Sequence, residues 1–358
     1  MGGTHMNFKK TVTIAAAAGA LCAFALPALA ETTLYGSARV QNFWKTTENK
    51  AVNPSDTNTD FDMHLATTSR LGINFSNGAL TGKVEVGGSN SNTRLLYGTY
   101  KFDFGTLLVG QNYNGYYVGS AQVAPIAADD NTNINFGALW DQRQAQVKLT
   151  LNNGVYLAAI QSTIPVTASS ELLIPKLNVG YEGKANNITF GGGIVGQTYK
   201  EQLIKKTITS VMGYAHGTLQ AGPAALLVNL GVGQNTGNMG LTSGNAAGAT
   251  AGPAAVYAGA TNVYANSKDT ISIEGMIQGS YTVSPVVKVN AIVGYAQDDN
   301  SKFKKVDNRM SVTVNAPVTL AKNVTIIPEF DYIDQLDQAA GTKGNKDYIY
   351  GAQMRIDF

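Results

Sequence analysis

The last residues of the chain, "YIYGAQMRIDF" (348–358), alternate between apolar or aromatic and polar side chains from Tyr350 onward. In an extended strand, successive side chains point to opposite faces, so Phe358, Ile356 and Met354 share one face while Asp357 and Arg355 lie on the other. One face is apolar or aromatic, and the other is polar. Such a strand fits a soluble sheet with one face on a core, and it also fits a wall between lipid and water. The rest of the chain has to distinguish the two.

The start of the chain predicts export. Two lysines, Lys9 and Lys10, precede the uncharged stretch "TVTIAAAAGALCAFALPALA" (11–30), whose last three residues form an A-x-A cleavage site before Glu31. A retained anchor is the alternative, but the run is marginal against the ~20 apolar residues that a helical span needs. We therefore interpret 1–5 as an added or overlong start, 6–30 as a signal peptide and 31–358 as the mature domain.

The composition departs from that of an ordinary soluble domain. Charged residues make up only 14% of the chain, against a usual ~25%, while hydrophobic residues make up 44% and glycine and tyrosine are abundant. The single cysteine, Cys22, lies in the predicted signal peptide, so the mature chain has no disulfide and no thiol nucleophile. The chain has 26 basic and 24 acidic residues, and the signal peptide carries Lys9 and Lys10. The mature balance is neutral, which argues against nucleic acid as a partner.

The mature chain contains no apolar run long enough for a transmembrane helix, so any span must be built from strands. Segments with period-2 alternation recur about sixteen times, at 33–44, 62–75, 79–88, 93–104, 107–113, 142–151, 154–163, 172–182, 188–199, 205–220, 224–235, 268–282, 285–296, 308–317, 322–334 and 346–358.

The connections alternate between two lengths. Tight turns rich in glycine, asparagine and proline occur at 76–78, 104–106, 152–154, 221–223 and 283–285, and most other connections are longer, such as 45–61, 114–141, 236–267 and 335–345. Residues 207–267 contain no charged side chain. Their last part, 236–267, is rich in Gly, Ala and Asn, and we interpret it as a long external loop. Short turns at one rim and long loops at the other predict an all-β fold, a transmembrane antiparallel β-barrel closed by pairing the last strand with the first.

Four stretches resemble the first, second to fifth and last strands of the general diffusion porins: "TLYGSARV" (33–40), "SRLGINFSNGALTGKVEV" (69–86), "TRLLYGTYKFDFGTLLVGQNYNGYY" (93–117) and "YGAQMRIDF" (350–358). These are trimeric, sixteen-stranded channels of the Gram-negative outer membrane. The resemblance covers roughly 33–160 and 346–358. It implies a homotrimer in contact with outer-membrane lipid and lipopolysaccharide, passive diffusion of small hydrophilic solutes and ions, and no cofactor. It also implies that the assembly machinery reads Phe358, with Ile356 and Met354.

The resemblance also implies a pore constriction, where an inward-folded third loop carries acidic residues that face a row of arginines. The basic wall then consists of Arg70, Arg94, Arg143 and Arg39, and the acidic loop of Asp129 and Asp130. Strand parity and the resemblance both favour lumenal arginines, whereas a solvated or snorkelling arginine is the alternative for each one alone.

The chain departs from the family at three places. Ser37 stands where the family has a basic residue, and Ile126 follows Pro125 where an acidic residue is expected. The connection at 88–92 is too short for the long loop that latches neighbouring subunits in the family.

Three other functions were weighed. A substrate-selective channel would use an aromatic track, for which Tyr113, Tyr116 and Tyr117 are candidates, although packing in an aromatic girdle or in the loop explains them better. A structural or adhesive surface barrel would conduct poorly. Hydrolysis is poorly supported, because the mature chain has only His64 and His216 and no G-x-S-x-G motif.

The segment "DDNTNIN" (129–135) begins like a calcium-binding loop. Its sixth position is Ile134 instead of glycine, and its twelfth is Trp140 instead of glutamate. We therefore predict a polar loop and no metal site.

Overall fold

The computed structural model describes residues 31–48, 57–88, 92–123, 136–162, 170–202, 205–241 and 268–358. The predicted signal peptide, the acidic pair Asp129 and Asp130, and most of the uncharged connection at 236–267 lie outside the described residues.

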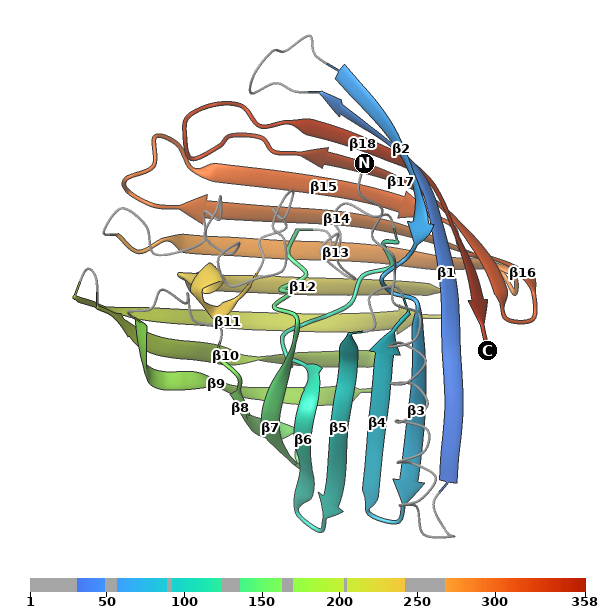
Figure 1. Cartoon of the computed structure of the whole chain (residues 1–358), viewed down its shortest axis with the longest axis horizontal. Helices are drawn as coiled ribbons and strands as arrows, with labels where there is room; N and C mark the ends of the chain where they lie inside the picture. Colours follow the sequence, from blue (N-terminus) through green and yellow to red (C-terminus); the bar gives the residue numbers. More distant parts are fainter. Residues whose placement is uncertain are drawn as a thin grey trace, which may run out of the picture.

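Almost all of the described chain is strand (Figure 1). The elements are β1 (Glu31–Glu48), β2 (Thr57–Leu65), β3 (Arg70–Asn77), β4 (Leu80–Gly87), β5 (Thr93–Phe102), β6 (Gly105–Tyr113), β7 (Arg143–Leu151), β8 (Val155–Ile160), β9 (Ser170–Ala185), β10 (Ile188–Glu201), β11 (Lys206–Ala221), β12 (Ala224–Gln234), the 3-10 helix η1 (Thr236–Met239), β13 (Ile271–Ser284), β14 (Val287–Asp299), β15 (Asp307–Asn315), β16 (Val318–Ala321), β17 (Val324–Asp334) and β18 (Lys346–Asp357). Among the described helices, none is long and apolar enough to cross a membrane.

The eighteen strand segments form a closed antiparallel barrel of sixteen strands, as the alternation predicted. β2 and β3 are two halves of one strand, because both pair with β1 in register order, Leu65 opposite Val40 and Arg70 opposite Ser37. β15 and β16 are likewise interrupted only at Ala316-Pro317, and both pair with β14 and β17. The alternation predicted 62–75 as one segment and 308–317 as a segment that ends before β16, so neither the first interruption nor the strand β16 was predicted.

The barrel closes between β1 and β18, from Ser37 opposite Asp357 to Glu48 opposite Lys346. At the bottom of this seam, the Gly36 N–H donates to the Phe358 carbonyl at 2.6 Å, and the Phe358 N–H donates to the Gly36 carbonyl at 3.0 Å. The terminal alternation therefore belongs to the closing strand, and its last residue contributes backbone hydrogen bonds to the closure.

The barrel is apolar outside and polar inside, the reverse of a soluble fold. On β9, Leu177 and Val179 are 39% and 54% exposed on the outer face. Lys176 and Asn178, which alternate with them along the strand, are fully buried. Phe358, Ile356 and Met354 follow the same rule and are exposed on the outer face of β18. This distribution fits a wall with lipid outside and a filled lumen inside.

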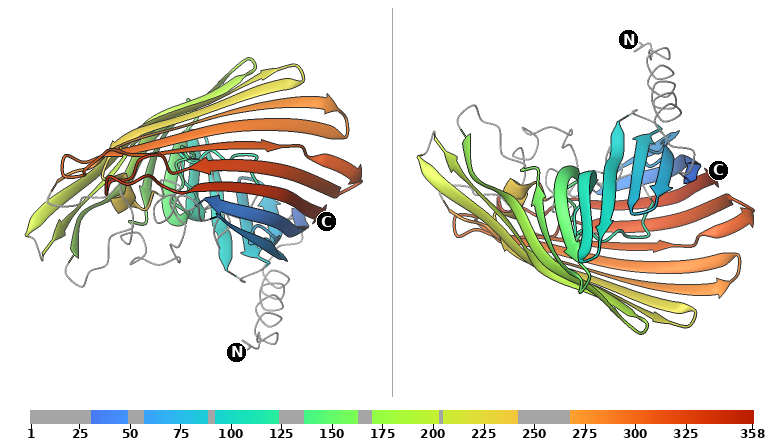
Figure 2. Two further views of the ribbon diagram at one scale, coloured as in Figure 1. Left: turned by 90° about the horizontal axis from the view of Figure 1, so that it is seen from above. Right: turned by 90° about the horizontal axis from the view of Figure 1, so that it is seen from below.

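The wall is uneven in height. β3 to β8 contain six to ten residues each, whereas β9 to β14 contain eleven to sixteen. The two groups lie on opposite sides of the barrel, which Figures 1 and 2 show as a short blue-to-green wall and a long yellow-to-orange wall.

The connection between β6 and β7, which we call the third loop, folds into the barrel. The outgoing part crosses the lumen to strands β13 to β17, which we call the far wall. There the Val123 N–H donates to Glu329 of β17 at 2.9 Å, and the Ala121 N–H donates to Gln278 of β13 at 2.8 Å. Asn315 of β15 returns a hydrogen bond to the Ala121 carbonyl at 2.6 Å. The expected inward fold is therefore present in the described part of this loop.

The returning part of the third loop packs against β12, β13 and β14 at backbone distance. Gly137, whose φ is 86°, lies so close to β13 that an added Cβ would be 2.1 Å from the carbonyl carbon of Gly275. On β14, a Cβ on Gly294 would lie 2.2 Å from the Phe136 carbonyl oxygen. Only glycine allows this approach, so these residues fix the loop against the long wall.

Candidate functional site

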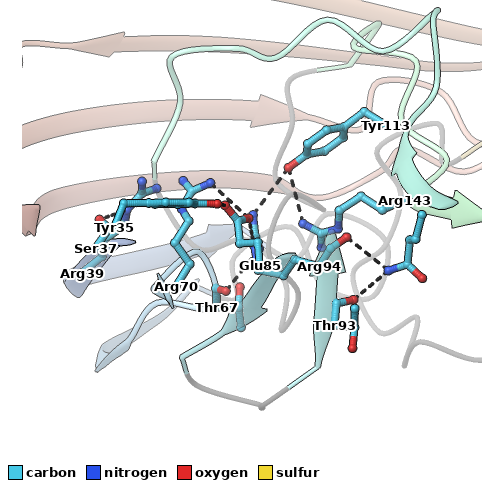
Figure 3. Close-up of polar contacts among 11 residues, drawn as sticks. Tyr35, Ser37, Arg39, Thr67, Arg70, Glu85, Thr93, Arg94, Tyr113 and Arg143 are labelled. Carbon is cyan, nitrogen blue, oxygen red and sulfur yellow. Dashed lines mark hydrogen bonds and ion pairs between the residues drawn. The ribbon is translucent and has the colours of Figure 1, made fainter. Parts of the chain in front are cut away.

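The four arginines expected at the constriction come together on the short wall and the adjoining strand β1 (Figure 3). Arg39 lies on β1, Arg70 opens β3, Arg94 lies on β5 and Arg143 opens β7. Arg39, Arg70 and Arg143 are half-buried, and Arg94 is only 1% exposed. At the edge of the group, Arg39 Nε donates to Ser37 Oγ at 2.9 Å, so the residue that departs from the family pattern contacts the arginine two positions later.

Within the part of the chain that the structure describes, one carboxylate lies inside this arginine row, that of Glu85 of β4, and it is 1% exposed. It accepts hydrogen bonds from Arg94 Nε at 2.7 Å, from Arg70 Nη1 at 3.5 Å and from the Tyr35 hydroxyl at 2.8 Å. A carboxylate with three donors offsets part of the repulsion between adjacent guanidinium groups. Sequence reasoning missed Glu85, because in "GKVEVGG" it is one alternating polar residue among many.

Strand parity alone does not place all four arginines. Regular alternation would put Arg94 on the outer face with Leu96, and Arg143 there with Val147. The β4–β5 register shifts between Glu85 and Val86, which leaves Arg94 opposite no single residue. Such a bulge re-aims a side chain, and here it brings Arg94 to Glu85.

Arg143 reaches the row from the end of its strand, through aromatic side chains. Its guanidinium lies 5.7 Å from the Tyr113 ring centroid and 5.6 Å from that of Trp140, and Tyr113 and Tyr117 stack at 5.1 Å. The Tyr113 hydroxyl accepts from Arg143 and Arg94, each at 3.5 Å. The aromatic track of a substrate-selective channel is not continuous, because Tyr116 is fully buried against β10 and β11 while the other two tyrosines pack around Trp140.

Both ends of the third loop are held by one carboxylate, that of Asp141. It accepts from Asn114 Nδ2 at 2.6 Å, from the Tyr116 hydroxyl and from Lys176 Nζ of β9 at 2.9 Å. Lys176 also donates to the Met239 carbonyl of η1 at 3.0 Å. The carboxylate and the ammonium are both 0% exposed, so this is a buried, hydrogen-bonded ion pair at the base of the loop.

The far wall carries its own acidic residues, but the third loop covers them. Glu329 is 4% exposed and accepts from the Val123 N–H and from Asn315, while Asp331 is fully buried and accepts from Gln122 at 3.1 Å and from a threonine hydroxyl. A second acidic group lies beside them, with Asp298 and Asp307 bound to the buried Arg309. These carboxylates hold the loop or pair with an arginine, and they are more deeply buried than Arg39, Arg70 and Arg143 of the arginine row.

The rim of the barrel that carries the connections after β14 and β17 presents exposed lysines around one bridging carboxylate. Asp337 accepts from Lys343 at 2.9 Å and from Lys305 at 3.1 Å, joining the connection after β17 to the one after β14. These two ammonium groups lower the pKa of the Asp337 carboxyl. Lys302 and Lys304 are also exposed in this region.

The two predicted acidic residues of the third loop, Asp129 and Asp130, lie outside the described residues, so their position opposite the arginines stays a prediction. Within the described ranges, no group of three His, Cys, Asp or Glu side chains could hold a metal ion.

No protein-family model and no curated protein matches the sequence. Solved structures do match the fold. The outer membrane channel DcaP of Acinetobacter baumannii is 18% identical with a TM-score of 0.68, and the match covers 94% of this chain and 99% of that one. A trimer form of OmpT, an outer membrane protein of Vibrio cholerae, is 17% identical with a TM-score of 0.58, covering 92% and 99%.

An anion-selective porin from Comamonas acidovorans is 13% identical with a TM-score of 0.59, covering 92% of this chain and 100% of that one. At these identities the likeness concerns the fold. The closed sixteen-stranded barrel with its inward third loop is the fold of the outer-membrane porins.

Proposed function

We propose that the chain is a porin of the bacterial outer membrane, a passive diffusion channel for small hydrophilic solutes and ions that favours anions at a constriction between the short wall and the third loop. We propose that it works as a homotrimer and has no catalytic role. The apolar outer face and the polar lumen support membrane insertion, and the likeness to outer-membrane channels supports the location.

The observation that carries the proposal is the charge imbalance across the lumen. Among the described residues, four guanidinium groups gather on the short wall and the adjoining β1 around one carboxylate, Glu85, whereas the far-wall carboxylates Glu329 and Asp331 are buried against the third loop. A unit charge attracts an opposite charge 4 Å away by about 1 kcal/mol in water, and by more where side chains displace water. An anion is therefore stabilised near the arginines, without a closed pocket to retain it.

Two further observations support a preference for anions. The connection after β14 carries the exposed lysines Lys302 and Lys304, which raise the local concentration of anions at the entrance. One protein with the same fold is described as anion-selective.

The proposal is tested by solute flux into proteoliposomes, with neutral, anionic and cationic solutes of one size. We expect the anionic solute to enter fastest, and the double variant Arg39→Gln/Arg70→Gln to reduce that advantage while the neutral solute enters at an unchanged or higher rate. Lys101→Gln is the matched control, because Lys101 is exposed near the tight turn after β5, away from the arginine row. Equal rates for all three solutes would contradict the charge selectivity.

Concentration dependence separates this proposal from a substrate-selective channel. Flux through a diffusion pore rises in proportion to solute concentration, whereas a binding track saturates. A structural or adhesive barrel would give no flux above that of empty vesicles.

A further inference from the structure

The connection after β12 turns into the barrel at its start. From the sequence we expected all of 236–267 to form an external loop, but every residue of η1, which opens this connection, is buried, and Leu241 after it is 1% exposed. The helix lies against β11 (Figure 1). The segment Thr236–Leu241 has no charged side chain, so its burial desolvates no ion. The external-loop prediction is therefore wrong for the described beginning of this connection.

Asn235 directs the chain inward at the end of β12. Its φ of 53° lies in the left-handed region, which asparagine adopts more readily than most residues with a side chain. Its backbone N–H donates to the Thr270 carbonyl at 2.8 Å, and its side chain accepts from the Thr270 N–H at 3.0 Å. The side-chain amide also donates to Asp269 at 2.8 Å. Because these bonds tie the end of β12 to the residues before β13, the inward turn is fixed at its origin.

Polar side chains of the long wall hold η1 in place. Gln197 Nε2 of β10 donates to the Asn238 carbonyl at 2.6 Å, and Asn238 Nδ2 donates to the Tyr199 hydroxyl at 2.8 Å. From β9, Lys176 Nζ donates to the Met239 carbonyl at 3.0 Å. The three wall side chains are at most 2% exposed. The segment is therefore docked on β9 and β10 by buried hydrogen bonds.

An apolar core lies between η1, the third loop and the long wall. Its members come from all three: Met239 and Leu241 after β12, Tyr116 and Leu139 of the third loop, and Val195, Met212 and Tyr214 on the lumen side of β10 and β11. A second apolar cluster continues beneath the third loop, where Ala138 packs on Met276 of β13 and Ile292 of β14. Apolar surface is excluded from water, so ions and hydrophilic solutes do not pass along this wall.

We propose that Thr236–Leu241 is a second pore-narrowing element, which closes the lumen along β9, β10 and β11 as the third loop closes it along β13 and β14. The path for solutes is then confined to the side of the arginine row. The inference rests on the proposed channel function and names a segment that sets the size limit of that channel. The half-buried arginines support this path, because they are more accessible than the covered inner face of the long wall.

The test compares the flux of a large and a small neutral sugar into proteoliposomes, together with single-channel conductance. Met239→Ser/Leu241→Ser removes the apolar contacts of the segment, and Gln197→Met/Tyr199→Phe removes its hydrogen bonds from the wall side. In both variants we expect the ratio of large-sugar to small-sugar flux to rise several-fold, with a larger conductance. Leu230→Ser is the matched control, because Leu230 is 52% exposed on the outer face of β12. Unchanged flux ratios and conductance in folded, heat-resistant variants would overturn the proposal.

Thiol labelling measures the docking of η1 without loosening it. In a Cys22→Ser background, Met239→Cys should react with a charged, membrane-impermeant thiol reagent many-fold more slowly than Lys302→Cys, which is exposed at the rim. Equal, fast labelling at both sites would place η1 in water and would overturn the proposal.

The rate of proteolytic cleavage in the third loop separates the two narrowing elements. We expect wild-type cleavage in Gln197→Met/Tyr199→Phe; a wider pore accompanied by faster cleavage would assign the narrowing to the third loop alone and contradict the proposal. Neutral sugars report size only, so a channel without anion preference whose flux ratio still rises would refute the proposed charge selectivity while supporting the second narrowing element.

Discussion

Replacing Lys176 with Met is expected to release the base of the third loop. Lys176 Nζ lies 2.9 Å from Asp141 Oδ2 with both groups fully buried, and the variant leaves the carboxylate with Asn114 and Tyr116 as partners. Removing one partner of a buried ion pair costs about 3–5 kcal/mol. Since 1.4 kcal/mol is a factor of ten, the ratio of docked to undocked loop falls roughly a hundred- to a few-thousand-fold.

The assay is single-channel recording together with the rate of proteolytic cleavage in the third loop. We expect added current fluctuations and faster cleavage in Lys176→Met. Lys148→Met is the control, because the Lys148–Glu182 pair is partly exposed, at 17% and 47%, and such pairs contribute about 0–1 kcal/mol. The double variant Lys176→Met/Asp141→Asn removes both charges and should recover much of the loss. Quiet channels and unchanged cleavage in Lys176→Met would refute the role of this pair.

Three further outcomes are expected. Glu85→Gln removes the carboxylate that the structure describes in the arginine row and should make the channel more anion-selective; an unchanged reversal potential would show that Glu85 does not contribute to the field in the pore. Gly294→Val should displace the returning part of the third loop at Phe136, since overpacking of this kind costs about 1–3 kcal/mol, and give noisier or larger single-channel currents, whereas Gly279→Val, whose Cβ meets nothing within 4 Å, should not. Deleting Phe358 removes its two backbone hydrogen bonds to Gly36 and an outward aromatic side chain, so less heat-resistant barrel should reach the outer membrane. Normal levels of folded barrel would count against this role of Phe358.

The fold could be predicted from the sequence because every strand of a barrel wall alternates between outward apolar and inward polar residues. The alternation at 172–182 or 346–358 is visible without any partner strand, and the tight turns carry their own residue signature. The heights of neighbouring strands could not be predicted, because alternation continues into hairpins above the wall. That β2 continues along β1 beyond the end of β4 could not be predicted, because it depends on where two separate segments end.

The candidate site could be predicted only in part. The arginines were found through the resemblance, although Arg94 reaches the row through a bulge that alternation does not reveal. Glu85 and the Lys176–Asp141 pair were missed, because a lumen lined by polar residues offers many equivalent candidates. Their importance comes from burial beside a partner distant in sequence, which appears only once the loop is folded inward.

The reversal potential of the wild-type channel in a potassium chloride gradient tests the central claim most directly. With a basic row facing the lumen, we predict that chloride is more permeant than potassium, and that the preference is larger near 0.1 M salt, where the Debye length is about 10 Å, than near 1 M, where it is about 3 Å. Arg39→Gln/Arg70→Gln should move the potential toward cation permeability. A wild-type channel that is cation-selective, or equally permeable to both ions at low salt, would contradict the assignment of the arginine row as the selective part of the pore.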